Sequence, residues 1–156
     1  MSDPAPPDSA AASLERYLHE HIPISRHLRA AVLEATFDRV RLTAPLAANV
    51  NHRGTAFGGS ISALAILAGW SLVHVRLRAT MNPWRIVIQR NTVEYLAPAE
   101  GDFEAACEGP DDDSWERFLS AAAERGRGRI DLAAQVVSNG RLAARFEGRY
   151  VAIRLP

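Results

Sequence analysis

One run of the chain, from residue 55 to residue 75, contains no Asp, Glu, Lys or Arg, and His74 is its only titratable side chain. It is about long enough to cross a bilayer as a helix. Three glycines, three serines and a threonine interrupt it, however, and the flanking segments read as strands of a sheet. A helix that is apolar all round is otherwise buried on all sides. We therefore predict a core helix from Gly58-Gly59 to about Val75, and no membrane partner.

Apolar and polar residues alternate in the flanking segments, which is typical of strands with one buried face. From Ala31 to Leu46 this alternation indicates a half-buried strand, with Ala31 to Phe37 as its partner or as the first half of the run. Asn139-Gly140 is a strong signal for a hairpin turn between the last two strands. The strands after the helix are expected at residues 85–96, 102–107, 129–137 and 141–153.

The N-terminal residues divide into a lead-in and a first helix. Residues 1–12 are rich in Pro and contain two acids, so we expect a disordered segment there. Apolar residues at helical spacing begin at Leu14, Ser13 is the expected N-cap, and Pro23 closes the helix. Residues 13–156 are then one domain of ordinary size.

A short helix is expected over residues 114–125, between two of the later strands. Asp113 and Glu116 have the spacing of a capping box, and Gly126 suits the C-terminal stop. Successive strands that can form hairpins give an antiparallel sheet, so the predicted fold class is α+β, with a sheet wrapped around one apolar helix. Such a sheet has open edges, and pairing with a second chain is a common way to cover them.

Charge and cysteine content exclude several functions. Acidic and basic residues balance at 18 each, whereas nucleic-acid-binding proteins carry a basic excess, so we expect no nucleic-acid partner. The single cysteine, Cys107, excludes an internal disulfide and suits the reducing cytosol. No signal peptide is visible, so the expected location is cytoplasmic. Asp111-Asp112-Asp113 lacks the further ligands of a calcium loop, and we expect neither a metal nor a cofactor.

Two motifs resemble those of a known superfamily. Residues 51–59, Asn-His-Arg-Gly-Thr-Ala-Phe-Gly-Gly, look like the loop before the central helix of hot-dog thioesterases, where relatives of PaaI commonly show Asn-x-x-Gly-x-x-His-Gly-Gly. Residues 93–101, Val-Glu-Tyr-Leu-Ala-Pro-Ala-Glu-Gly, are similar to a second segment of that superfamily. Together with His52, Phe57 and Ser60, they most resemble the YiiD C-terminal-domain family of thioesterases, over about residues 14–153.

The resemblance implies a hot-dog fold that hydrolyses acyl-CoA or acyl-carrier-protein thioesters at a site shared between subunits, in a homodimer or a dimer of dimers. It also shows two departures. Phe57 stands where PaaI-like enzymes carry His, and Ile66 stands where they carry Asp. No acid occurs between Gly54 and Leu77, so the mechanism in which that carboxylate activates water or attacks the thioester cannot be carried over.

The remaining candidate catalytic residues gather around Gly58 and Gly59. Backbone N–H groups at a helix N-terminus can bind the thioester carbonyl oxygen, or the two glycines only allow the turn into a buried helix. Asn51 is either an orienting amide or a turn former, and His52 is either a general base or an exposed loop histidine. Ser60 is a nucleophile, a hydrogen-bond donor or simply a helix cap.

Glu94 is the best candidate where the reaction requires a carboxylate. Alternation along the strand places Glu94 on the face of Ile86 and Ile88, and Asn91 on the other face. The two polar side chains can point into one site only if a bulge intervenes, and the alternative for Glu94 is a solvated face. Phe57 and Asn91 are expected to contact the substrate.

Three functions compete. A thioesterase is the leading one, and a non-catalytic module that binds acyl thioesters is favoured by the missing helix acid. A hot-dog dehydratase needs a His and an acid placed across the dimer, which Phe57 and Ile66 disfavour.

Overall fold

The computed structural model describes residues 9–156. Its six strands form one antiparallel sheet with the order β1-β2-β4-β5-β6-β3. The strands are β1 (Ala31–Ala35), β2 (Arg39–Ala44), β3 (Trp84–Tyr95), β4 (Phe103–Glu108), β5 (Arg127–Ser138) and β6 (Arg141–Arg154). The helices are α1 (Ala10–His21), α2 (Ile24–His27), the 3-10 turn η1 (Leu46–Ala48), α3 (Gly58–Leu77) and α4 (Asp112–Arg125).

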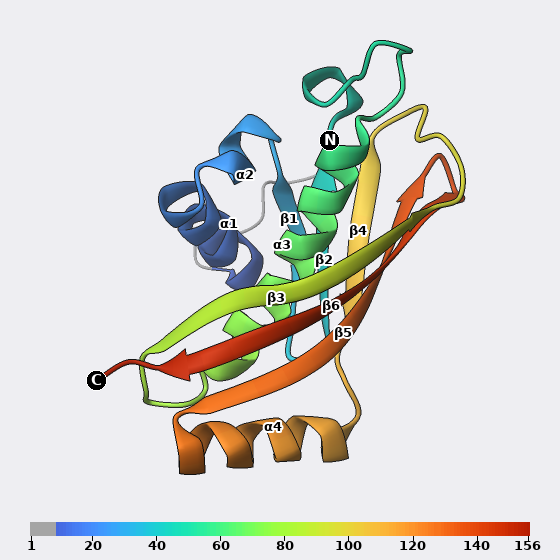
Figure 1. Cartoon of the computed structure of the whole chain (residues 1–156). Coiled ribbons are helices and arrows are strands. Elements are labelled where there is room, and N and C mark those ends of the chain that lie inside the picture. Colours follow the sequence, from blue (N-terminus) through green and yellow to red (C-terminus); the bar gives the residue numbers. More distant parts are fainter. Residues whose placement is uncertain (1–8) are drawn as a thin grey trace.

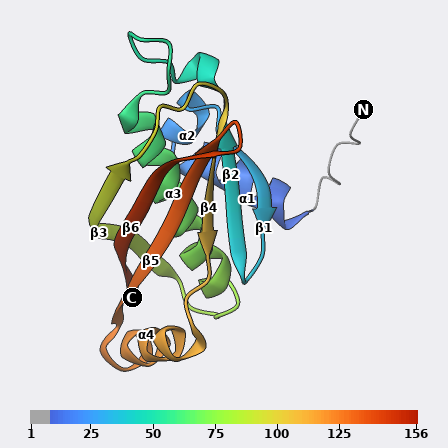
Figure 2. The same cartoon turned by 90° about the vertical axis from the view of Figure 1, so that its right-hand side faces the viewer.

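The sheet curves around α3, with α1 and α2 beside that helix and α4 across one end of the sheet (Figures 1 and 2). Alternate residues of the strands point toward α3 and are buried, as Val40, Leu42 and Ala44 on β2 show. The opposite face is largely charged and exposed. This is the hot-dog arrangement that the resemblance implies, and the predicted α+β class is confirmed.

Burial explains the uncharged composition of α3. Leu64, Ala65, Ala68 and Leu72 are at most 1% exposed. The helix is long and apolar enough to cross a membrane by length and composition alone. Most of it is covered by the sheet, however, so a position in the protein core accounts for the missing charges.

The sheet approaches the backbone of α3 closely at Gly69. The Tyr150 hydroxyl, on β6, donates a hydrogen bond to the carbonyl oxygen of Ile66 at 2.7 Å. A Cβ atom on Gly69 would overlap that hydroxyl oxygen and lie 2.7 Å from two carbons of the ring. Burial raises the pKa of the Tyr150 phenol, so the group is a neutral donor. Glycine therefore sets the spacing between α3 and β6.

The first helix starts earlier than predicted. Ser9, and not Ser13, is its N-cap, because the Ser9 hydroxyl accepts a hydrogen bond from the backbone N–H of Ala12 at 3.1 Å. The expected lead-in over residues 1–12 is therefore too long, since residues 10–12 are helical. Residues 1–8 lie outside the described chain. After α1 ends, Pro23 precedes the short helix α2, which the sequence pattern did not predict.

The N-cap of α4 also differs from the prediction. Asp111, and not Asp113, accepts the capping hydrogen bond from the backbone N–H of Ser114, at 2.8 Å. The helix accordingly begins at Asp112. Gly126 ends it in the left-handed conformation, with a φ of 70°, as expected.

A bulge in β3 interrupts the alternation of its side chains. Ile88 pairs with Tyr150 of β6, and the next pair is Arg90 with Arg149. Gln89 is therefore an extra residue on the β3 side of the ladder. Because an extra residue exchanges the two faces of a strand, side chains after the bulge point the opposite way from those that strict alternation predicts.

The bulge overturns the predicted face of Glu94. Beyond it, Tyr95 points toward α3, because its hydroxyl donates to the carbonyl oxygen of Gly58 at 2.9 Å. Glu94, the residue before Tyr95, pairs with the exposed Arg145 of β6 on the outer face of the sheet. Asn91 lies on the same side as Tyr95, so Asn91 and not Glu94 shares the inner face with Ile88.

Four rings stack between α1 and α3. The ring centroids of Tyr17 and His21 lie 4.1 Å apart, and those of Trp70 and His74 lie 4.9 Å apart. Tyr17 joins the two pairs, at 4.5 Å from His74 and 6.0 Å from Trp70. The Nε2 atom of His74 is buried and has no hydrogen-bond partner within residues 9–156. Burial lowers the pKa of His74 to about 4, and the charges of Arg78 and His21 contribute to the shift.

The free energy of unfolding is expected to decrease in acid because of His74. The folded chain keeps this imidazole neutral down to a pH of about 4, whereas in an unfolded chain the imidazole binds a proton at about pH 6.5. The contribution of the neutral His74 ring to the free energy of unfolding is complete above about pH 6.5 and is lost as the pH falls toward about 4. The loss is roughly 2 kcal/mol after allowance for partial solvent exposure. Urea denaturation at about pH 7 and about pH 4.5 measures the loss.

The matched variant is His74→Phe, which keeps an aromatic ring in the stack and cannot bind a proton. We expect it to remove most of this difference between the two pH values. A variant that loses as much stability in acid as the unmodified protein would show that other groups are responsible.

Candidate active site

The N-terminus of α3 presents two unpaired backbone donors. Phe57 is its N-cap, with extended backbone (φ −61°, ψ 132°) and no side-chain capping bond. The Phe57 carbonyl accepts from the N–H groups of Ser60, at 2.9 Å, and Ile61, at 3.1 Å. The N–H groups of Gly58 and Gly59 have no protein acceptor in the described part of the chain. They lie at the positive end of the helix dipole, where an anion or a carbonyl oxygen that gains negative charge is stabilised.

Two aromatic rings flank these donors. The Tyr95 ring lies 3.4 Å from the position that a Cβ on Gly58 would occupy, and the Phe57 ring lies over Gly59, with its Cδ1 atom at 3.1 Å from a Cβ there. Phe57 is 58% exposed and Tyr95 is 54% exposed. The absence of side chains at positions 58 and 59 makes room for these two rings beside the donors. Sequence reasoning missed Tyr95 as a site residue, although it belongs to the second motif.

The two motif segments lie side by side in the structure. The backbone N–H of Ala56 donates to the carbonyl oxygen of Ala99 at 2.9 Å. With the bond from Tyr95 to Gly58, this contact fixes the loop before α3 against the segment after β3. Segments that are distant in sequence therefore build one site.

The Asn51 side chain is occupied within its own loop. Its Nδ2 atom donates to Oγ1 of Thr55 at 2.9 Å, and its Oδ1 atom accepts from the N–H groups of Arg53 and Thr55, at 2.8 and 3.2 Å. Gly54 completes the turn with a φ of 80°. Because both ends of the amide are engaged, the geometry favours the turn former over the orienting amide.

His52 and Ser60 are close to the donors in sequence but are not fixed by contacts. His52 lies exposed near the tip of the loop, and Ser60 is half-buried in the first turn of α3. Neither side chain makes a hydrogen bond within residues 9–156, so Ser60 does not cap the helix. No contact within one chain orients either group as a base or a nucleophile.

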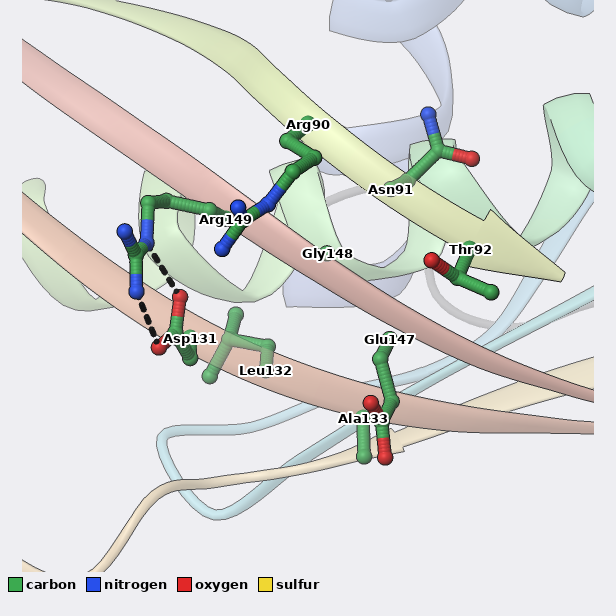
Figure 3. Close-up of a pocket in the computed structure, with 9 residues that line it drawn as sticks. All are labelled: Arg90, Asn91, Thr92, Asp131, Leu132, Ala133, Glu147, Gly148 and Arg149. Atoms are coloured by element: carbon green, nitrogen blue, oxygen red, sulfur yellow. Dashed lines mark hydrogen bonds and ion pairs between the residues drawn. The ribbon is translucent and has the colours of Figure 1, made fainter.

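The structure brings Asn91 to the inner side of the sheet and leaves Glu94 on the outer side. Figure 3 shows the Asn91 amide projecting from β3 away from Thr92 and Arg90. Ile66, which stands where the resemblance places an acid, lies seven positions after Gly59 on the same face of α3 and is only partly buried. No acid of α3 therefore faces the donors.

A surface depression of about 560 Å³ on the outer face of the sheet is the alternative site (Figure 3). Its main polar contact is a two-fold hydrogen-bonded pair in which Arg149 donates to Asp131 at 2.7 and 2.9 Å. The Arg149 guanidinium lowers the pKa of Asp131. These charges neutralise one another, and the sheet separates them from the N-terminus of α3. The helix N-terminus is therefore the better candidate for chemistry.

Cys107 is not an alternative nucleophile. Cys107 is buried on the inner face of β4, and burial raises its pKa to about 12, so it remains a thiol and not a nucleophilic thiolate. In the chain from residue 9 onward, no group of three or more His, Cys, Asp and Glu side chains is placed to hold a metal ion.

Fold and site together define the class of protein: a hot-dog domain with free N–H donors at the start of its central helix. Residues 11–154 match the sequence model of the family described as "Putative thioesterase (yiiD_Cterm)". The chain belongs to this thioesterase family.

Solved structures show the same fold. A protein of unknown function from Chlorobaculum tepidum TLS is 27% identical with a TM-score of 0.89, over 96% of this chain and 97% of that one. A structure described as a putative thioesterase from Shewanella oneidensis is 30% identical with a TM-score of 0.81, over 92% of this chain and 96% of that one. A mutant of the phenylacetic acid degradation protein PaaI from Thermus thermophilus is 23% identical with a TM-score of 0.62, over 85% and 99%, and it shows the fold alone.

Proposed function

We propose that this protein hydrolyses acyl thioesters of CoA or of acyl carrier protein at the N-terminus of α3, in a site that a second subunit completes. The observation that carries the proposal is the pair of free N–H groups at Gly58 and Gly59. They are preorganised donors for the oxygen of a thioester carbonyl, which becomes an oxyanion when water attacks. Membership in a thioesterase family supports the reaction class.

In the proposed reaction, water adds to the carbonyl carbon and the oxyanion is held by the two N–H groups. The carbon–sulfur bond then breaks, and the thiol and the carboxylic acid leave. Because α3 carries no acid, the proton of the attacking water needs another acceptor. His52, in the loop that precedes the donors, is the candidate general base, and Ser60 is a candidate hydrogen-bond donor in the first turn.

Pairing of two chains through β3 is the proposed assembly. β3 is a twelve-residue strand at one edge of the sheet, and its outer hydrogen-bonding edge has no partner strand within the described chain. Val87 on this strand and Leu96 beside it are exposed large apolar residues, and so is Phe57 at the site. A second copy would cover the edge and the apolar side chains together. Asn91, on the inner face of the same strand, is then a candidate substrate contact.

A binding module without turnover is the second candidate function. The observation that favours it is the apolar Ile66 on the helix face that starts at Gly59, together with the outward position of Glu94. Such a protein would hold the thioester carbonyl at the same donors and would lack a group to activate water. For either function, the buried thiol of Cys107 fits a location in the reducing cytoplasm.

Release of free thiol from a series of saturated acyl-CoAs and from acylated carrier protein tests the proposal. We expect turnover with a kcat/KM of at least about 10⁴ M⁻¹s⁻¹ for the preferred substrate. Direct binding of acyl-CoA thioether analogues, which cannot be hydrolysed, is measured in parallel. Binding without thiol release would establish the binding module, and the absence of both would overturn the proposed function.

A further inference from the structure

One face of α3 forms an apolar stripe that is only partly buried. The stripe contains Gly59, Ala63, Ile66 and Trp70, which recur at spacings of four, three and four residues and so lie above one another on the helix. The face of α3 that packs against the sheet, with Leu64, Ala65, Ala68 and Leu72, is buried. The stripe begins at the proposed carbonyl-binding donors and runs along α3 away from them.

Trp70 is fixed at the far end of this stripe. Its indole Nε1 donates to the carbonyl oxygen of Ile86 on β3 at 2.9 Å. The ring stacks on His74 with the planes 16° apart and on Tyr17 with the planes 18° apart. A rotation of the indole would break the hydrogen bond and both stacking contacts, so the ring is a fixed obstacle.

A pocket of about 390 Å³ lies beyond Trp70, between the end of α3 and the start of β3. Tyr17, His74 and Ile86 line it, and each of them also contacts Trp70. Trp84 lines it as well, and its Nε1 atom donates to Oγ1 of Thr80 at 2.8 Å. The indole of Trp70 therefore stands between the half-open stripe and a pocket with a mixed polar and apolar lining, in which Leu77, Pro83 and Trp84 are among the apolar residues.

We propose that Trp70 determines the acyl chain length of the substrate, by ending the acyl path along α3 and restricting the protein to chains of medium length. This inference rests on the proposed function, because it assumes that the thioester carbonyl binds at Gly58 and Gly59. From position 59 to position 70 the helix rises by about 16 Å, at about 1.5 Å per residue. Van der Waals contact between the end of the acyl chain and the Trp70 ring takes up about 4 Å of this length.

The remaining distance of about 12 Å corresponds to about ten carbon atoms, since an extended chain advances about 1.2 Å per bond. Helical side chains lean toward the N-terminus of their helix, which shortens the available path slightly. The preferred acyl group therefore has about eight to ten carbons, by the same geometry.

Trp70→Ala should join the stripe to the pocket and move the preference toward longer chains. The measurement is kcat/KM for thiol release across saturated acyl-CoAs from butyryl-CoA to palmitoyl-CoA. We expect the unmodified protein to prefer octanoyl- or decanoyl-CoA. In the variant, kcat/KM for palmitoyl-CoA should rise at least about tenfold relative to decanoyl-CoA, since each methylene that becomes buried contributes about 0.8 kcal/mol.

Two further variants keep the test decisive. Trp70→Phe retains a ring against Tyr17 and His74, and it replaces Trp70→Ala in the test if the alanine variant does not fold. We expect it to shift the chain-length preference less than Trp70→Ala. Trp84→Phe is the matched control, because it alters a tryptophan of the pocket on the far side of the obstacle. It should leave the preference of the unmodified protein unchanged.

Dissociation constants of the thioether analogues, measured over the same chain lengths, should follow the same order in every variant. An unmodified protein that processes palmitoyl-CoA as well as decanoyl-CoA overturns the role of Trp70 and leaves the proposed function intact. The same conclusion follows when the Trp70 variants keep the preference of the unmodified protein. Failure to hydrolyse or bind any acyl-CoA overturns the proposed function and this inference together.

Discussion

Gly58→Pro is expected to lower kcat for acyl-thioester hydrolysis by about 100-fold or more, because loss of one oxyanion donor typically costs about 10²–10³ in kcat. Proline lacks the backbone N–H that we assign to oxyanion binding. The backbone suits this substitution. Position 58 is the first residue of α3, where the N–H has no acceptor within the helix, and Phe57 before it is extended. Steady-state kinetics measures kcat, and thermal unfolding verifies that the fold persists.

Gly58→Ala is the matched control. Alanine retains the N–H, and its Cβ would lie 3.4 Å from the Tyr95 ring, which is close to ordinary van der Waals contact. We expect kcat within about threefold of the unmodified protein, because no interaction specific to the transition state is lost. If the proline and alanine variants are both as active as the unmodified protein, this N–H does not bind the oxyanion. If both lose activity to the same extent, the added side chain blocks the approach of the carbonyl.

The architecture could be predicted from the sequence because composition and periodicity restrict it strongly. A long uncharged run has to be buried, and the alternating strands around it provide the surface that buries it. The turn at Asn139-Gly140 and the stop at Gly126 depend on local conformations that few residues adopt, and both occur as expected. These features could be predicted because only one local conformation or one degree of burial fits the residues that form them.

Features with several equivalent solutions were predicted less well. Ser9 and Ser13 are both suitable caps for α1, and Asp111 and Asp113 are both suitable caps for α4. Which residue caps depends on where the chain leaves its neighbouring segment, and tertiary packing decides that. The bulge at Gln89 has the same origin, since it concerns the hydrogen bonds between β3 and β6 and leaves no signal in the sequence of β3.

The sequence offered two motifs without placing them in contact, and only the structure shows that they come together around the start of α3. The roles of individual side chains required coordinates. Asn51 can orient a ligand or hold a turn, and only the occupied ends of its amide distinguish the two. Glu94 required knowledge of the bulge. Tyr95 was quoted in a motif, but its contact with Gly58 depends on the inner face that the bulge creates.

The second large effect concerns stability. Gly69→Ala is expected to reduce the free energy of unfolding by about 3 kcal/mol, although alanine is the better helix former by about 1 kcal/mol. The added Cβ would overlap the Tyr150 hydroxyl and lie 2.7 Å from its ring carbons. Both groups are buried, so α3 has to move away from β6 or the hydrogen bond to Ile66 has to break. Urea denaturation measures the loss, and Ser62→Ala, on the half-exposed side of α3, should change stability by less than about 0.5 kcal/mol.

A double-mutant cycle with Tyr150→Phe identifies the cause of that loss. Tyr150→Phe alone removes the bond to the Ile66 carbonyl and should cost about 1 kcal/mol. In its background, Gly69→Ala should cost at least about 1 kcal/mol less than in the unmodified protein, because the hydroxyl that the new methyl group meets is absent. The cost should not vanish, since the ring carbons remain at 2.7 Å. Equal costs in both backgrounds would show that Tyr150 does not set the approach of α3 to the sheet. A coupled result would show that one glycine in the middle of α3 sets the distance between that helix and β6.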